Sequence, residues 1–366
     1  MLAGAQAVGV VAGALPAALF TRGRSRRAAI ITGGTITGAG IVGILLSGTL
    51  APLFLSAALV GFGGIVATSS GAALLADATE AAHRPTRFGQ QIALGTSAAF
   101  LSSVLAGALA SPVATFFGAH PGDAIVLRAL VASGGTIAAL SLVPILAIRA
   151  VPVRVETLAA PTRNALLRRF LAIEVVFGFG AGSFLPFVNL FFADRFGIPF
   201  GALGLVLGVL AFAGSLGALA HGRLLAARFG AIPSIVAVEL LSLPFALVAA
   251  FTGTLAVAVA ALAARHFLMF GASGTVNAFQ LSSFTPAERA GANAVLALSW
   301  SAANAVGAIT SGAVRSALGP AGFTLNLVTL TAAYALAALL TWRLFSAHVP
   351  GGDVVLPLVA APDSRA

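Results

Sequence analysis

The chain has 366 residues, of which 59% are hydrophobic and only 8% are charged, and its mean hydropathy is +1.04. Soluble globular proteins carry about 25% charged residues, so this composition excludes a water-soluble globular domain and favours a chain embedded in lipid. The formal net charge of +10 comes from 20 arginines against 10 acidic residues, and no lysine is present. The absence of cysteine excludes disulfides, a thiol nucleophile and a cysteine-ligated metal site.

Long apolar segments follow one another along the whole chain. A helix needs about 20 apolar residues to cross the roughly 30 Å hydrocarbon core of a bilayer. By this length we predict eleven spans, near residues 3–20, 28–47, 52–75, 91–118, 123–147, 170–192, 199–220, 231–251, 255–280, 291–313 and 322–342. They lack the alternation of apolar and polar residues that strands of a membrane barrel require. The start, MLAGAQAVGV, has no basic region before a cleavage site, so we interpret it as a span and not as a signal peptide. The sequence therefore predicts an all-α, multi-pass membrane protein with eleven transmembrane helices.

The arginines are distributed unevenly between the two sides of these spans. The stretch FTRGRSRR at 20–27, between the first two spans, holds four of them. Sixteen of the 20 arginines lie in this connection, in every second connection after it, or in the C-terminal tail. The connections on the opposite side of the spans hold only Arg195 and Arg315. Arg128 lies about six residues inside its span, and we expect its long side chain to reach the membrane surface. Arginine accumulates in cytoplasmic loops, which predicts a cytoplasmic C-terminus and, with eleven spans, an external N-terminus. The basic stretch is then a membrane anchor, and no nucleic-acid partner is expected.

The chain also contains an internal repeat. Arg22 and Arg223 are 201 residues apart, as are Arg27 and Arg228, and two further loop arginines lie 202 apart. The shared offset predicts two related halves. We therefore predict an N-terminal bundle of five spans at 1–147, a cytoplasmic central loop at 148–169, a C-terminal bundle of six spans at 170–345 and a cytoplasmic tail at 346–366. The span 170–192 has no counterpart in the first half, and we expect that an opening helix is missing before Met1, through a misplaced start or a truncation.

Two helical halves, a charged central loop and short basic loops at equivalent places resemble the major facilitator superfamily of secondary transporters. In that family the loop after the second helix follows the pattern G-x-x-x-D-R-x-G-R-R/K. Here an arginine replaces the acid in the first half, and Ala227 replaces it in RLLAARFG of the second half. We interpret five residues as remnants of the motif, with Arg22 at the position of the acid: Arg22, Arg26, Arg27, Arg228 and Gly230. The resemblance covers nearly the whole chain and implies the two-bundle fold, but the missing acids put the family's salt bridge between the bundles in doubt.

Ionisable residues inside a span are costly and are therefore candidates for function. Glu174 lies about one turn inside the span 170–192, where it either pairs with the nearby Arg168 and Arg169 or carries a proton at the mouth of a cavity. Glu239 and Arg265 lie on consecutive spans joined by a short turn, so these antiparallel neighbours can form an intramembrane ion pair or handle solute or protons. The family resemblance implies that the spans 170–192 and 255–280 line the cavity, which favours Arg265 over Glu239 as a solute contact.

Neutral polar residues and glycines inside the spans have a structural and a functional interpretation. Polar side chains in spans usually make hydrogen bonds between helices, but they can also line a path. The candidates for a solute or proton pathway are Glu174, Asn189, Arg265, Asn277, Gln280 and Asn304.

Small residues spaced by four, at Gly34 and Gly38 and at Gly204 and Gly208, predict close helix packing. The stretch GFGAG at 178–182 lacks the strand of a dinucleotide loop, and we interpret it as a place where a helix bends when the cavity opens.

The favoured function is a transporter that moves a small solute by alternating access, without ATP chemistry in this chain. The weakly charged interior favours efflux of a hydrophobic or amphipathic compound, with proton coupling through Glu174. The alternative is a non-transporting remnant or sensor on the same fold. No catalytic motif stands in a credible context, so we expect no enzyme activity, no cofactor and no metal. The expected partners are the lipid bilayer, a solute and protons, and the expected form is a monomer in a bacterial inner membrane.

Overall fold

The computed structural model describes residues 5–6, 8–13, 26–79, 84–148, 165–221, 225–284 and 286–346. These residues are nearly all helical, and no strand occurs among them. The predicted all-α architecture is therefore confirmed. Most of the first predicted span, the central loop between 149 and 164, the end of the tail, and Arg22 and Arg223 lie outside the described residues.

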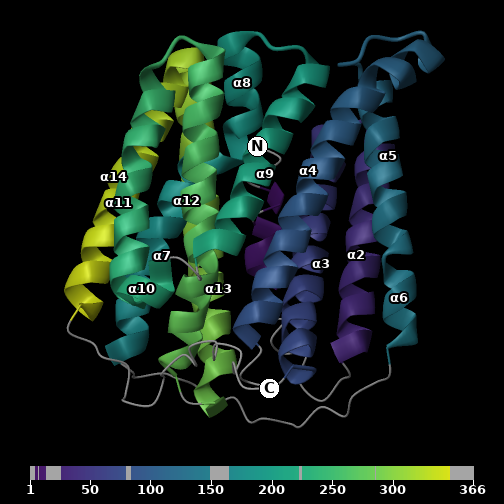
Figure 1. Cartoon of the computed structure of the whole chain (residues 1–366). Coiled ribbons are helices and arrows are strands. Elements are labelled where there is room, and N and C mark those ends of the chain that lie inside the picture. The colour runs from purple at the N-terminus through teal and green to yellow at the C-terminus, as the bar shows by residue number, and fades with distance from the viewer. Residues whose placement is uncertain are drawn as a thin grey trace, which may run out of the picture.

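The first half consists of helices that stand side by side (Figure 1). Their bounds are α2 (Arg26–Leu46), α3 (Leu50–Asp77), α4 (Arg84–Phe117), α5 (Ala124–Leu140) and α6 (Leu142–Ala147). Helix α2 packs along α3 and also contacts α5. The described part of the first predicted span packs on α3, where Gly9 meets the backbone of Ala58.

The second half forms a more closely packed bundle. Its elements are α7 (Ala165–Phe184), a 3₁₀ turn (Leu185–Phe187), α8 (Val188–Phe196), α9 (Phe200–His221), α10 (Ala227–Phe229), α11 (Ala231–Phe251), α12 (Leu255–Ser282), α13 (Pro286–Leu318), a 3₁₀ turn (Gly319–Ala321) and α14 (Gly322–Phe345). Helix α7 packs on α13 and α14, α11 packs on α12 and α14, and α9 packs on α12.

Nine helical stretches of the described residues are long and apolar enough to cross a membrane. The last of them, Val295–Phe345, contains both α13 and α14, so the ten predicted spans from 28–47 onward each coincide with a helix. The predicted total of eleven stays a prediction, because the first span is described only in part. Helix α7 begins five residues before the predicted span, since Arg168 and Arg169 continue the helix as exposed residues beyond its apolar part.

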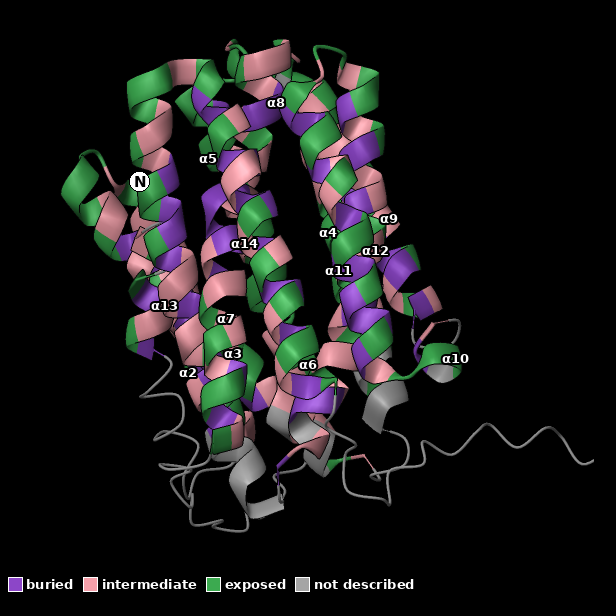
Figure 2. Ribbon diagram, turned by 90° about the vertical axis from the view of Figure 1, so that its left-hand side faces the viewer, coloured by how far each residue is buried: buried purple, intermediate pink, exposed green. Residues whose placement is uncertain are grey.

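The two ends of the molecule differ in charge. Helices α2, α4, α7, α11 and α13 begin at one end of the molecule, where the described helices carry Arg26, Arg27, Arg168, Arg169 and Arg228, and we call it the arginine-rich end (lower end in Figure 1). Helix α8 and the turn between α13 and α14 lie at the opposite end. Along the sides, many large apolar residues are exposed, such as Leu46 at 81% and Phe116 at 82% (green in Figure 2). Such a surface suits lipid tails, which are as apolar as these side chains.

The two halves meet along α4 and α9. Gly204 packs against Ser103 and Gly107 of α4 so closely that a Cβ at Gly204 would overlap the Ser103 carbonyl oxygen. Farther along the same line, Ser215 donates a hydrogen bond to Thr96, with an O–O distance of 2.7 Å. We call this contact the α4–α9 seam. It combines close backbone approach with one polar contact, as expected for helices that associate in lipid.

The predicted small-residue pairs are only partly correct. Gly208 faces Phe100 and Val104 across the seam, so the pair of Gly204 and Gly208 is confirmed as a packing surface. Gly34 contacts Leu142, but Gly38 has no atom within 4 Å of an added Cβ. The prediction for Gly38 is wrong because α2 turns a different face to its main partner: Gly33, Gly40 and Gly43 meet α3.

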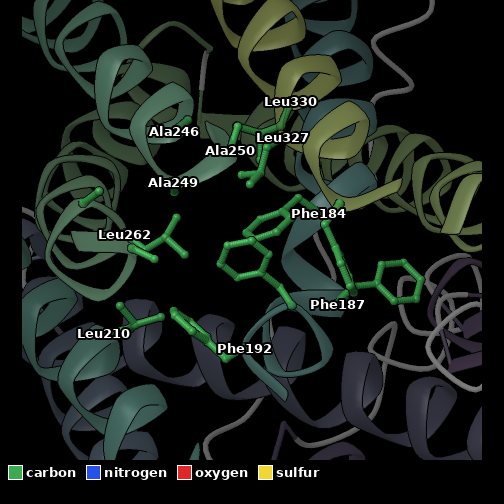
Figure 3. Close-up of a cluster of buried hydrophobic side chains, with 14 of the residues drawn as sticks. Phe184, Phe187, Phe192, Leu210, Ala246, Ala249, Ala250, Leu262, Leu327 and Leu330 are labelled. Atoms are coloured by element: carbon green, nitrogen blue, oxygen red, sulfur yellow. The ribbon is translucent and has the colours of Figure 1, made fainter. Parts of the chain in front are cut away.

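The largest buried cluster lies in the second half, where phenylalanines of α7 and α8 meet α11, α12 and α14 (Figure 3). Phe184 and Phe192 are fully buried beside Leu262 and Leu327. Aromatic rings at this end contact one another edge to face, as with Phe184 and Phe191 at 5.4 Å between centroids. This cluster fills the opposite end of the bundle.

The stretch GFGAG at 178–182 does not bend. Helix α7 is continuous through it, and Gly178 and Gly182 press against the α13 backbone at Trp300 and Asn304. The interruption comes later, at the 3₁₀ turn Leu185–Phe187, where Pro186 removes a backbone donor. These glycines serve close packing in this structure, and a bend that accompanies opening of the cavity stays a prediction.

We expect Gly182→Ala to destabilise the protein, because the new Cβ would overlap the Asn304 carbonyl oxygen and overpacking costs about 1–3 kcal/mol. The matched control is Gly274→Ala on α12, where nothing lies within 4 Å. That change should be neutral or stabilising by about 0.5–1 kcal/mol, since alanine is the better helix former. Thermal unfolding of both variants in detergent checks this, and equal midpoints for the two would contradict it.

Candidate functional site

A polar contact joins α7 to α12 near the arginine-rich end. The Nε2 atom of Gln280 donates a hydrogen bond to Oε1 of Glu174. Gln280 is buried and Glu174 is half-buried. In the described part of the chain Glu174 forms no ion pair with Arg168 or Arg169, and Arg169 instead donates to the Leu344 carbonyl at 3.4 Å. Two of the residues predicted for a solute or proton pathway are thus brought together.

An aromatic cluster lies next to this contact on the side of the arginine-rich end. Phe170, one turn before Glu174, contacts Phe279 and Phe345 at centroid distances of 5.5 and 4.5 Å. Phe279 directly precedes Gln280, so the rings lie beside the hydrogen bond. The cluster is buried, so apolar rings lie beside the polar contact on this side.

Arg265 lies in the core of the second bundle. It is 3% exposed, and its Cζ atom lies 4.9 Å from the ring centroid of Tyr334 on α14. The Tyr334 ring in turn stacks on Phe177 of α7 at 4.3 Å. A cation above an aromatic face is stabilised electrostatically. The Nε and Nη2 atoms of Arg265 have no hydrogen-bond partner among the described residues. The side chain therefore points toward α14, within the bundle.

Glu239 on α11 is also buried, at 4% exposed, and its Oε2 atom has no hydrogen-bond partner in the described ranges. No ion pair joins it to Arg265 there. The expected pair is absent because the guanidinium lies over Tyr334 instead. Glu239 and Arg265 thus place two ionisable side chains in the interior of this bundle without an ion pair between them.

The remaining predicted residues occupy different environments. Asn304 donates to the Gly178 carbonyl at 3.5 Å, a contact between α13 and α7 that supports their packing. Asn189 and Asn277 are exposed, on α8 and α12 respectively. The structure thus joins Gln280 to Glu174, gives Asn304 a packing contact, and leaves Asn189 and Asn277 exposed, so their role in a pathway stays a prediction.

The loop-motif residues have structural contacts of their own. Arg27 donates to the Ile148 carbonyl at the end of α6, at 3.2 Å. Arg228 is exposed, with its guanidinium 5.5 Å from the Phe229 ring centroid. Gly230 precedes α11 with a φ of 84°, which favours glycine. Arg26 begins α2.

Two arginines at the opposite end were not recognised from the sequence as structural. Arg195 on α8 donates to the carbonyls of Ala250 and Thr252 at 2.8 and 3.0 Å and to Thr324 Oγ1 at 3.2 Å. It thereby satisfies carbonyl groups at the end of α11, where a cation is also favoured by the helix dipole. Arg315 on α13 forms an ion pair with Asp194. The sequence feature that could have indicated these roles is the adjacent pair of Asp194 and Arg195 in an otherwise uncharged connection.

Comparison with known proteins identifies the family. The family profile of the Major Facilitator Superfamily matches residues 1–308. The chain belongs to the major facilitator superfamily. This membership, together with the apolar helices, makes it a membrane transporter, a class that is generally not enzymatic. A search of curated protein sequences finds no match.

Solved transporter structures share the fold across nearly the whole chain. The human organic anion transporter MFSD10 (TETRAN) is 15% identical, with a TM-score of 0.68 over 93% of this chain and 82% of its own. The nucleoside transporter NupG is 15% identical, with a TM-score of 0.71 over 93% and 90%. The E. coli fucose:proton symporter FucP is 13% identical, with a TM-score of 0.68 over 93% and 89%. At these identities the similarity establishes the two-bundle fold.

We expect Arg265→Met and Arg195→Met to have opposite effects on stability. The guanidinium of Arg265 is buried against Tyr334, and two of its nitrogens have no hydrogen-bond partner among the described residues. Arg265→Met replaces this costly buried charge with an apolar side chain, so its unfolding midpoint should match or exceed that of the unchanged protein. Removing Arg195 leaves the Thr252 carbonyl without this donor and the Ala250 carbonyl with the Thr324 hydroxyl as its remaining side-chain donor, and it should lower the midpoint by about 2–4 °C. Thermal unfolding in detergent measures both, and a larger loss for Arg265→Met would refute this interpretation.

Proposed function

We propose that this transporter moves a small hydrophobic or amphipathic solute by alternating access and couples the movement to protons through Glu174. The observation that carries the proposal is the hydrogen bond between Glu174 on α7 and Gln280 on α12. It is a polar contact between two helices that, by the family resemblance, border the central cavity. A relative movement of α7 and α12 has to break or remake this contact.

A proton on Glu174 changes what this contact can do. An ionised carboxylate accepts the Gln280 amide hydrogen, whereas a protonated carboxyl group can also donate a hydrogen bond. Within a largely apolar environment the ionised form needs the amide donor. Gain or loss of the proton therefore alters the contact between α7 and α12, which is the physical link between proton movement and helix movement in this proposal.

The solute class follows from the character of the interior. Within the described bundles, buried ionisable side chains are few, and buried apolar and small side chains dominate. A strongly polyanionic solute would need a cluster of cationic side chains in the cavity, whereas Arg265 is directed into the bundle core. This composition supports a hydrophobic or amphipathic solute, and we propose efflux as the direction. The solutes named for the similar structures are diverse, so they do not narrow this choice.

We further propose the arrangement of the chain in the membrane. The arginine-rich end faces the cytoplasm of a bacterial cell, with the C-terminal tail on the same side, in agreement with the arginine bias. The five-span and six-span halves then divide at the connection 148–169. We propose that one chain is sufficient for transport, because both bundles that form an alternating-access transporter come from the same polypeptide.

Everted membrane vesicles with an imposed pH gradient test the coupling, with ethidium as an amphipathic probe. Vesicles that contain the unchanged protein should accumulate ethidium when their interior is acidic. Glu174→Gln should retain the hydrogen-bonding shape but lose the dependence of uptake on the gradient, because an amide carries no titrating proton. Asp194→Asn, an acid at the opposite end that pairs with Arg315, is the matched control and should keep that dependence.

The possible outcomes separate the parts of the proposal. Gradient-dependent uptake that persists in Glu174→Gln removes Glu174 from the coupling. Uptake that the unchanged protein drives equally well without a gradient removes proton coupling altogether. No ethidium movement above that of protein-free vesicles counts against efflux of amphipathic cations.

A further inference from the structure

A half-open cavity of about 180 Å³ lies between α9, α11 and α12. Its walls include Ala220 of α9, Leu225 just before α10, Val238 of α11, and Phe267 and Leu268 of α12. The surface inside is apolar. We call it the α9–α11 groove. Figure 2 shows these helices side by side, with α10 at their lower end.

The groove has a fixed shape because its helices are held together at several points. Both α9 and α11 pack on α12. Gly217 meets the backbone of Phe267 directly, so α9 and α12 are in close contact at the base of the groove. His221, the last residue of α9, is 4% exposed, and its Nδ1 lies 3.0 Å from Thr275 Oγ1 of α12. A preformed apolar groove can bind a ligand without first being opened.

The surroundings of the groove are those of a lipid-facing surface. Leu216 and Leu219 on α9 and Leu240 and Leu241 on α11 are between 44% and 56% exposed. The groove extends from His221 at the end of α9 to Val238, seven residues into α11, which corresponds to about 10 Å along the membrane normal. This depth suits part of an acyl chain that enters from the leaflet at the arginine-rich end.

A positive charge stands at the same end of the groove. Leu225, which lines the groove, begins a short helical turn that carries Arg228 three residues later. Arg228 is exposed, and its guanidinium lies beside the exposed ring of Phe229. The sequence from 221 to 238 contains no acidic residue, since Ala227 stands where the family motif has its acid. An anion at the membrane surface would therefore meet Arg228 without competition from a neighbouring carboxylate.

We infer that the α9–α11 groove is a binding site for an anionic phospholipid of the leaflet at the arginine-rich end. One acyl chain occupies the groove between Ala220, Val238 and Phe267, and the lipid phosphate contacts Arg228. Both parts are needed, because the groove offers only apolar contacts and the arginine offers the charge that discriminates between headgroups. Neither Glu174 nor Gln280 lines the groove, and the inference does not depend on the proposed transport mechanism.

Thermal unfolding of the purified full chain in detergent tests the inference, with phosphatidylglycerol and phosphatidylcholine of identical acyl chains as probes. A ligand that binds the folded state raises the unfolding midpoint. Phosphatidylglycerol should raise it more than phosphatidylcholine. In Arg228→Gln, about five times more phosphatidylglycerol should be needed for the same rise in the unfolding midpoint. This factor corresponds to ~1 kcal/mol for one arginine at a membrane surface. Ala220→Leu, which fills the groove, should reduce the response to both lipids.

Matched controls separate the site from general effects. Arg343→Gln removes another exposed arginine at the same end of the molecule, and Ala260→Leu enlarges an exposed alanine of α12 outside the groove. Both should respond to lipid like the unchanged protein. Native mass spectrometry of Arg228→Gln, a surface change that leaves the packed helices intact, should show fewer bound phosphatidylglycerol molecules, which keeps the test decisive should Ala220→Leu fail to fold.

Four results would overturn the inference. If the two lipids raised the unfolding midpoint equally, the groove would bind acyl chains without recognising the headgroup. An equal response to inorganic phosphate alone would make Arg228 a general anion contact. Unchanged lipid binding in both Arg228→Gln and a folded Ala220→Leu would place the lipid elsewhere, and a dimer that Ala220→Leu dissociates would identify the groove as an interface between two copies.

Discussion

The cost of placing charge in hydrocarbon governs this structure more than any other interaction. Most of the arginines lie in connections and helix ends, and at the opposite end both Arg195 and Arg315 have partners. A charge near the bilayer centre costs about 2.5–3.5 kcal/mol on insertion scales. Arg265 and Glu239 bear this cost in the core of the second bundle, where the guanidinium lies against the Tyr334 ring and the Glu239 Oε2 atom has no hydrogen-bond partner among the described residues. Such residues are hard to explain by stability and are therefore the natural focus for function.

Packing without a strong hydrophobic force between helices is the second constraint. Lipid tails compete equally well for apolar side chains, so helices associate where small residues let backbones approach. Gly178 and Gly182 bring α7 onto α13, and Gly107 and Gly204 bring α4 onto α9. The first contact holds one bundle together, and the second joins the two halves. Close packing at glycines therefore serves both within one bundle and at the boundary between the two halves.

Sequence patterns predicted the helices well and the side-chain partners poorly, for a physical reason. Hydropathy and arginine bias depend on local composition, so the spans from α2 to α14 could be predicted from the sequence. The partner of Arg265 depends on α14, about 70 residues away, where Tyr334 covers the guanidinium. Likewise, GFGAG permits either a bend or close packing, and only the position of α13 decides between them. The contact of Glu174 with Gln280 required the crossing of α7 and α12, which no spacing in the sequence encodes.

The 3₁₀ turn at Leu185–Phe187 has a mechanical consequence. On one side of it, α7 is fastened to α13 through its glycines, and on the other, α8 is clamped by Arg195 to the end of α11 and by Asp194 to Arg315. Both arms of this element are thus attached to the same bundle, so a displacement of α8 would act on α11 and α13 as well as on α7.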